Sequence, residues 1–204
     1  HLNEAEKEYL VETLNPYLEQ RIDVSTVKAG FGGFRPLLAA DTSKSTKSLL
    51  RDHEVEIDSV SGLVSLMGGK WTTYRLMAKD TVDQIDSIFT RNNECGTANH
   101  VLVGGENYNF EHYKKFMSRY DLPKDVCQHL MKKYGSKAEE ICIITTRNAS
   151  LRDRLHADLP YIQAEVVYTV RVEMAMKPRD FLARRIRLEL TDWKISAEVL
   201  PVVA

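Results

Sequence analysis

The stretch Gly62–Lys79, GLVSLMGGKWTTYRLMAK, decides how this chain folds. Leu63–Met67 is short and apolar, which favours a strand, and Gly68–Gly69 permits a tight turn directly after it. A helix can begin beyond the turn, with Thr72 or Thr73 as its N-cap. The sequence therefore predicts a strand, a glycine turn and a helix in succession.

Such a turn favours an anionic group. Unpaired backbone N–H groups and the positive end of the helix dipole point out of it, and Lys70 adds a full positive charge beside them. On the local pattern alone, a plain strand-to-helix turn with a solvated lysine is the more common outcome.

The residues before the turn predict the strand that pairs with it. His53–Asp58 alternates polar and apolar residues, and Ser59–Gly62 supplies the turn of a β-hairpin. Helical spacing of apolar residues runs over Thr72–Phe89. Near the start of the chain, Asn3 followed by Glu6 predicts a capped helix.

The second half of the chain predicts only helices. Residues 90–106 are rich in Asn and Gly and read as a linker. The helices expected beyond it are Phe110–Tyr120, Pro123–Tyr134, Lys137–Thr145, Tyr161–Met176, Arg179–Leu190 and one beginning near Lys194. The expected fold class is α+β, with an incomplete portion of antiparallel strands and helices at 1–94, a linker at 95–105 and an all-α bundle at 106–204.

The expected helix Tyr161–Met176 is apolar on most faces and yet carries charges. We expect it to be central in the bundle, with Glu165 and its neighbouring charges paired to Arg184 and Arg185. An acid/base or anion site built from these charges is the alternative. The scattered histidines are expected to be packing or surface residues, namely His100, His112, His129 and His156.

Composition narrows the class of protein. With 43% hydrophobic residues, 28% charged residues and a net charge of -1, the 204-residue chain is typical of a soluble globular protein that does not bind nucleic acid. No apolar run approaches the ~20 residues of a membrane-spanning helix. Three cysteines without CxxC spacing predict reduced cytosolic thiols and no metal site. Because the chain begins with His1, we expect a piece of a longer protein.

Four blocks of the sequence resemble the FAD-dependent glycerol-3-phosphate dehydrogenase family. They are GFRPL (Gly33–Leu37), Arg51-Asp52, GLVSLMGGKWTTYR (Gly62–Arg75) and the run AEVVYTVRVEMAMKPRDFLARRIRL (Ala164–Leu188). The order and spacing of the blocks match, and the resemblance covers almost the whole chain. The family's GxGxxG motif and its general-base histidine are not among these residues, so no catalytic residue is assigned and the chain alone is expected to be inactive.

The resemblance implies oxidation of sn-glycerol 3-phosphate to dihydroxyacetone phosphate, with a hydride moving from C2 to N5 of FAD and electrons passing to a quinone or to oxygen. The substrate-binding residues implied are Arg35, Arg51 and Lys70. The implied FAD-binding residues are Gly33, Arg35, Gly68, Gly69, Lys70, Trp71, Thr72 and Thr73. Guanidinium groups suit the substrate because they bind phosphate bidentately.

The resemblance also implies a cytoplasmic location, with peripheral contact at the inner face of the cell membrane and a homodimer as candidate associations. Two alternatives stay open. Another flavoprotein of the D-amino-acid oxidase type would use the GxRP arginine to hold a carboxylate. A helical interaction module without catalysis would use the Gly62–Lys79 stretch as a structural turn only.

Overall fold

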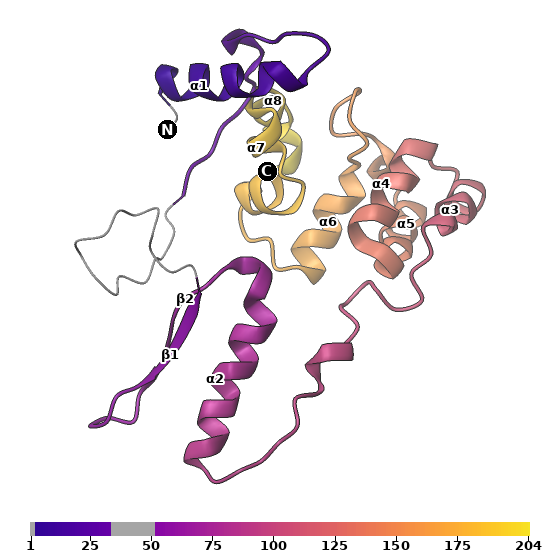
Figure 1. Ribbon diagram of the computed structural model, residues 1–204. Helices are drawn as coiled ribbons and strands as arrows, with labels where there is room; N and C mark the ends of the chain where they lie inside the picture. Colours follow the sequence, from indigo (N-terminus) through magenta and orange to yellow (C-terminus); the bar gives the residue numbers. More distant parts are fainter. Residues whose placement is uncertain (1–2, 34–51) are drawn as a thin grey trace. The chain divides into compact units, whose positions relative to one another are not determined.

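A computed structural model describes residues 3–33 and 52–204, and these fall into two compact units (Figure 1). The described part of Gly33–His100 forms one unit, and the described part of His1–Gly32 joins Val101–Ala204 in the other. The first unit holds the strands and the second is helical. The α+β class, with antiparallel strands and helices ahead of a helical bundle, is confirmed.

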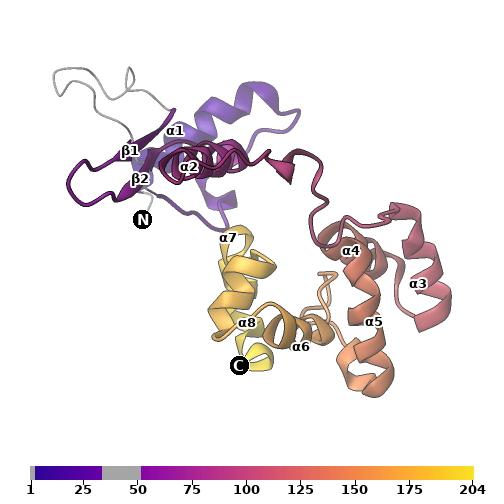
Figure 2. The same ribbon diagram turned by 90° about the horizontal axis from the view of Figure 1, so that it is seen from below.

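The unit within Gly33–His100 is a β-hairpin with one helix along it (Figures 1 and 2). Strands β1 (His53–Ile57) and β2 (Val64–Gly68) pair antiparallel, with His53 opposite Gly68. The predicted turn at 59–62 closes the hairpin, and the Asp58 amide donates to the Leu63 carbonyl oxygen over 2.9 Å. Helix α2 (Tyr74–Ile88) follows and packs against both strands.

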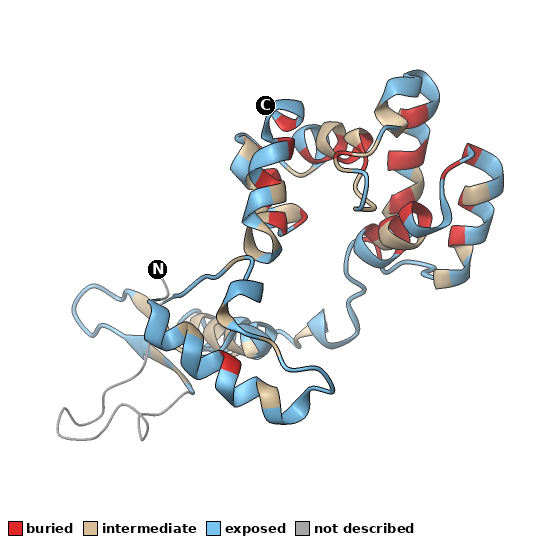
Figure 3. Ribbon diagram, turned by 90° about the horizontal axis from the view of Figure 1, so that it is seen from above, coloured by how far each residue is buried: buried red, intermediate tan, exposed pale blue. Residues whose placement is uncertain are grey.

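No described residue of this unit is buried, as the pale blue and tan colours of β1, β2 and α2 in Figure 3 show. Large apolar side chains of the unit are exposed, among them Val60, Leu63, Trp71, Val82 and Phe89. Two strands and one helix offer too little surface to enclose a core, because small folds bury only a small fraction of their area.

The second unit is built from helices. They are α1 (Glu4–Leu14), α3 (Tyr113–Tyr120), α4 (Lys124–Tyr134), α5 (Ala138–Arg147), α6 (Gln163–Val172), α7 (Leu188–Thr191) and α8 (Trp193–Val203). Short 3-10 turns precede or follow several of them. The capping box predicted at the chain start is confirmed. The Asn3 side chain accepts a hydrogen bond from the Glu6 amide over 2.9 Å, and the Glu6 carboxylate accepts one from the Asn3 amide.

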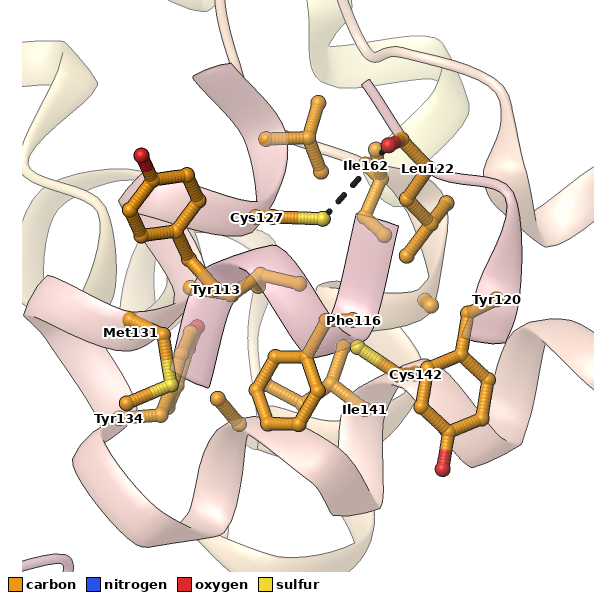
Figure 4. Close-up of a cluster of buried hydrophobic side chains, with 14 of the residues drawn as sticks. Tyr113, Phe116, Tyr120, Leu122, Cys127, Met131, Tyr134, Ile141, Cys142 and Ile162 are labelled. Atoms are coloured by element: carbon orange, nitrogen blue, oxygen red, sulfur yellow. Dashed lines mark hydrogen bonds between the residues drawn. The ribbon is translucent and has the colours of Figure 1, made fainter. Parts of the chain in front are cut away.

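The core of this unit consists of two clusters of buried side chains. In the larger one, residues of α3, α4, α5 and the start of α6 converge (Figure 4). The second joins α7, α8 and the segment before them, through Leu155, Phe181, Leu182, Ile186, Leu188, Val199 and Val203. Helix α6 lies between the two groups of helices (Figure 2) and contacts α5 and α8.

Two of the predicted helices are shorter or more broken than expected. Helix α6 spans Gln163–Val172, which is shorter than the predicted 161–176. Its central position agrees with the prediction, but Val170, Val172 and Met174 are exposed, so the segment is not enclosed on all sides. The single helix expected over 179–190 is a π-helical segment, Asp180–Arg185, followed by the short α7. Arg187 between them has a φ of 58°, which interrupts the helix.

The three cysteines are unpaired thiols in different surroundings. Cys127 and Cys142 are buried in the larger core cluster, and the Cys127 thiol points to the Leu122 carbonyl oxygen, 3.7 Å away (Figure 4). Burial raises the pKa of Cys127 to about 11 and that of Cys142 to about 12. Cys95 is only half-buried, and its pKa is lowered, chiefly by the Thr97 hydroxyl 3.1 Å from its sulfur.

Among residues 3–33 and 52–204, no helix is long and apolar enough to span a membrane.

Candidate functional site

The glycine turn has the geometry that the sequence predicts. Gly68 and Gly69 have φ values of 69° and 82°, in the left-handed region that costs side-chain-bearing residues free energy. The Gly69 amide donates to the Asp52 carbonyl oxygen over 3.0 Å, which extends the hairpin ladder by one further bond. The turn is therefore fastened to the residue that precedes β1.

A side chain at Gly69 would displace the flexible end of Met77, besides adopting a left-handed backbone conformation. A Cβ atom there would lie 2.6 Å from the Met77 sulfur and methyl carbon, and 3.2 Å from the Cβ of His53. Met77 belongs to α2 and His53 to β1. The turn is thus held between the first residue of the hairpin and the second turn of the helix.

A short 3-10 turn, Trp71–Thr73, separates the glycines from α2. Thr73 occupies the N-cap position of α2, but its hydroxyl donates backward to the Lys70 carbonyl oxygen over 3.0 Å and caps nothing. The expectation that a threonine side chain caps the helix is therefore wrong. In the described part of the chain, the amides of Lys70, Trp71 and Thr72 donate to no protein group, as is usual where a helix begins.

The side chains after the turn are accessible. Lys70 is exposed, and the Trp71 side chain is 88% exposed with its ring centroid 5.9 Å from that of Tyr74. Free amides, a cation and flat aromatic surface together can hold a planar ring with anionic character at one edge.

The remaining predicted site residues lie partly outside the description. Arg35 and Arg51 fall outside residues 3–33 and 52–204. Gly33 is exposed, and a Cβ there would meet no atom within 4 Å. The structure does bring together Asp52 and Gly69, which are the chain neighbours of Arg51 and Lys70.

Sequence reasoning missed one contact directly behind the turn. The His53 Nε2 atom lies 2.8 Å from an Asp80 carboxylate oxygen, and the His53 side chain is 9% exposed. Asp80 is on α2, one helical turn beyond Met77. A histidine at the first position of a strand and an acid 27 positions later carry no local pattern that predicts their pairing.

Sequence reasoning named the wrong partner for a second carboxylate, that of Glu165. Glu165 is fully buried, and its carboxylate accepts from Tyr134, 3.0 Å away, and lies 2.8 Å from His129 Nε2. His129 is therefore not a lone histidine, and the expected pairing of Glu165 with Arg184 or Arg185 is wrong. Arg185 does reach a charge of the same segment, with its Nε 3.4 Å from the Glu173 carboxylate. Because Glu165 is fully buried among the helices, a structural role is favoured for this cluster.

Arg184 pairs within its own segment, 3.0 Å from Asp180. Within the described residues, no group of three or more His, Cys, Asp or Glu side chains is placed to hold a metal ion.

Comparison with known proteins places these features in a family. A sequence profile described as the C-terminal domain of alpha-glycerophosphate oxidase matches residues 95–204, which is more than half of the chain. The chain belongs to this family. The predicted resemblance to FAD-dependent glycerol-3-phosphate dehydrogenases is confirmed by relatives whose match extends to residues before position 95.

Two curated relatives illustrate the match. A probable mitochondrial glycerol-3-phosphate dehydrogenase of Caenorhabditis elegans is 37% identical over 96% of this chain and 28% of its own length. The mitochondrial glycerol-3-phosphate dehydrogenase of Mus musculus is 35% identical over 98% of this chain and 28% of its own length. The chain therefore spans less than a third of the length of these two relatives.

A solved structure supports the fold. The glycerol-3-phosphate dehydrogenase of Bacillus halodurans, complexed with FAD, is similar with a TM-score of 0.61 and 28% sequence identity. The match covers 74% of this chain and 31% of that structure.

Proposed function

We propose that the protein carrying this sequence oxidises sn-glycerol 3-phosphate to dihydroxyacetone phosphate with FAD as the hydride acceptor. The observation that supports the proposal best is the glycine turn, where two left-handed glycines precede an exposed lysine and three amides that have no partner among residues 3–33 and 52–204. The relatives that match 96% and 98% of this chain are named glycerol-3-phosphate dehydrogenases.

Each residue has a physical task in this proposal. Bound FAD supplies an acceptor for the hydride that leaves C2 of the substrate. The amides of Lys70, Trp71 and Thr72 and the Lys70 ammonium would stabilise the negative charge that develops at the pyrimidine edge, because pre-oriented dipoles need no reorganisation. Arg35 is proposed to hold the substrate near the ring, and Arg51 to bind its phosphate bidentately. The other proposed flavin contacts are Gly33, Gly68, Gly69 and Thr73.

Several features of the reaction are proposed at a finer level. The electron acceptor is a quinone, with oxygen as the second candidate because the matching profile is that of an oxidase domain. We also propose a cytoplasmic protein with peripheral contact at the inner membrane face, assembled as a homodimer. Residues 1–204 alone are expected not to turn over substrate, since no GxGxxG occurs among them.

An anaerobic titration tests the proposal. The purified natural polypeptide that contains this sequence is expected to show flavin absorbance bands that bleach when glycerol 3-phosphate is added. Flavin bands that do not change when glycerol 3-phosphate is added, but bleach when a D-amino acid is added, would contradict the proposed substrate. A preparation without flavin would contradict the flavoenzyme altogether.

Steady-state kinetics test the phosphate role separately. Arg51→Ala is expected to raise KM for glycerol 3-phosphate by about 10-fold or more, because a charge-assisted bidentate contact is lost. Arg91→Ala removes the same charge just beyond the far end of α2 and serves as the matched control. Equal KM values for the two variants would remove Arg51 from the substrate site.

A further inference from the structure

The contact between His53 and Asp80 has no place in the function proposed so far. It joins the first residue of β1 to the middle of α2, and neither side chain is assigned to substrate or flavin. The contact is short, at 2.8 Å, and is shielded from water on the His53 side, where the side chain is 9% exposed, while the Asp80 side chain is 39% exposed. Shielding strengthens such a hydrogen bond relative to one at the surface.

The position of His53 connects this contact to the glycine turn. His53 pairs with Gly68 across the hairpin, and its Cβ is 3.2 Å from the place where a Cβ on Gly69 would lie. Met77, whose sulfur and methyl carbon lie 2.6 Å from the place of that same Cβ, precedes Asp80 by three residues and so lies on the same face of α2. One face of α2 therefore touches the turn directly through Met77 and holds His53 through Asp80.

The second ring nitrogen of His53 faces the same junction. Nδ1 is buried, lies 3.4 Å from the Asp52 carboxylate and has no hydrogen-bond partner among the described residues. Asp52 in turn receives the Gly69 amide through its carbonyl oxygen. The ring thus stands between Asp80 on one side and the residue that fastens the turn on the other.

We infer that His53, held by Asp80, is a positioning residue that fixes the glycine turn and thereby aims Lys70 and the amides that follow it. The inference rests on the proposed function, because it assigns the turn to the flavin. His53 itself touches no reacting atom. A displacement of about 1 Å at such a site can reduce the rate by about 100-fold, so a support of this kind has a measurable effect.

Three variants of α2 test the inference in the holoenzyme. Asp80→Ala removes the acceptor, Asp80→Asn keeps an oxygen at the same place, and Asp83→Ala removes a carboxylate whose partner among the described residues is Lys79. We expect kcat to fall by about 10-fold for Asp80→Ala, to recover largely with Asp80→Asn and to stay unchanged for Asp83→Ala. Equal kcat values for Asp80→Ala and Asp83→Ala would overturn the inference.

The flavin midpoint potential separates positioning from general stability. If Lys70 and the amides move away, the reduced, anionic flavin loses stabilisation and the potential becomes more negative. Each tenfold loss of affinity for the reduced over the oxidised flavin corresponds to about 30 mV for a two-electron couple. A lower melting temperature with an unchanged potential would mean that the contact is structural only, and would contradict the inference.

Amide hydrogen exchange of Gly69 and Thr73, whose amides donate to the carbonyl oxygens of Asp52 and Lys70, gives a readout without flavin or substrate. We expect at least a tenfold faster exchange there in Asp80→Ala and in His53→Phe, with no further increase in the double variant, because the two residues act as one unit. Additive effects would overturn the inference. If the wild-type protein fails to bleach with glycerol 3-phosphate, the proposed function fails, while the exchange data still decide whether His53 and Asp80 hold the turn.

Discussion

Glu165 shows how a single buried charge is satisfied in the helical unit. Its carboxylate accepts from Tyr134 and from the Ile162 amide, over 3.0 Å each, and lies 2.8 Å from His129. Burial, with the neighbouring Glu165 carboxylate, raises the pKa of Tyr134, so the phenol stays a hydrogen-bond donor across the ordinary pH range. The sequence identifies Glu165 as a charge that needs a partner, but its side-chain partners, His129 and Tyr134, lie more than 30 positions earlier, where no local spacing points to them.

Removing this carboxylate should destabilise the helical unit. Glu165→Ala leaves buried donors without an acceptor, and we expect a loss of about 3 kcal/mol in the free energy of unfolding. Urea denaturation followed by circular dichroism measures it. Glu198→Ala, at an exposed carboxylate, is the control and should change stability by less than about 0.5 kcal/mol. An equal effect of both variants would show that the buried network contributes nothing specific.

Asp125 predicts a pH-dependent contribution to stability. The Arg154 guanidinium holds it with two bonds of 2.7 and 2.8 Å and lowers the pKa of Asp125 below its ordinary value of 3.8. A carboxyl group whose pKa is lower in the folded state than in the unfolded state stabilises the folded protein at pH values above the unfolded-state pKa. This stabilisation is lost as the pH falls through the folded-state pKa. Because the Asp125 side chain is 55% exposed, the contribution should stay below about 1 kcal/mol.

The measurement compares urea denaturation of the wild type and Asp125→Asn at pH 7 and at pH 2 to 3. The stability difference should be present at pH 7 and shrink toward the lower pH. Asp153→Asn, at an acid one residue before Arg154, is the matched control and should show no such trend. A difference that grows on acidification would contradict the assigned sign.

At the scale of elements, the end of α4 is fixed by a close backbone contact. Gly135 ends the helix with a φ of 58°, and a Cβ on it would lie 1.9 Å from the Gly104 carbonyl oxygen. The same oxygen accepts from the Ser136 amide over 2.8 Å. Gly135 was predictable as a helix terminator, but the approach of residue 104 was not, because it depends on the path of the chain from 90 to 109.

Gly135→Ala should therefore reduce the free energy of unfolding by more than the left-handed backbone conformation alone would. The new methyl group would push the backbone at Gly135 away from that at Gly104. We expect this to reduce the free energy of unfolding by more than about 3 kcal/mol, because a clash between backbone atoms cannot be relieved by a change of side-chain rotamer. Gly62→Ala has a similar φ of 73° with open space around it, and should cost about 1 kcal/mol. Thermal unfolding of both variants gives the comparison. Similar losses would mean that the contact with residue 104 yields easily.

The helix boundaries show where element-level prediction ends. The period of apolar residues located α2 to within two residues at its start, since its stripe faces the hairpin. Over 179–190 the same period was present, yet the backbone forms a π-helical segment and a break at Arg187. Packing of Phe181 and Leu182 into the second core cluster accompanies that break, and such tertiary packing leaves no trace in local spacing.

At the scale of the whole molecule, burial is distributed unequally. Every residue of both core clusters lies between Tyr113 and Val203, whereas no described residue between 52 and 100 is buried. We expect residues 95–204, expressed alone, to unfold cooperatively in urea, since the apolar surface that drives folding is enclosed within them. Residues 33–100 alone should show no cooperative transition. A sigmoidal unfolding curve for 33–100 would contradict this reading.

The candidate site was predictable in part, for a physical reason. The glycine turn and the lysine beside it follow from residue types within one short stretch, because the turn is a local structure. The support behind it depends on side chains from β1 and α2 that meet only after the hairpin closes. Local chemistry was therefore readable from the sequence, while the contacts that orient it required the fold.

The three thiols differ in reactivity, so their rates of chemical modification can report how often the helical unit opens. At neutral pH a thiol reagent should modify Cys95 at once, because its lowered pKa increases the thiolate fraction. Cys127 and Cys142, with pKa values raised to about 11 and 12, should react only when the core opens. Mass spectrometry of labelled protein would then give one fast and two slow modifications, and the slow rates would report directly how often the helical unit opens, without any introduced probe.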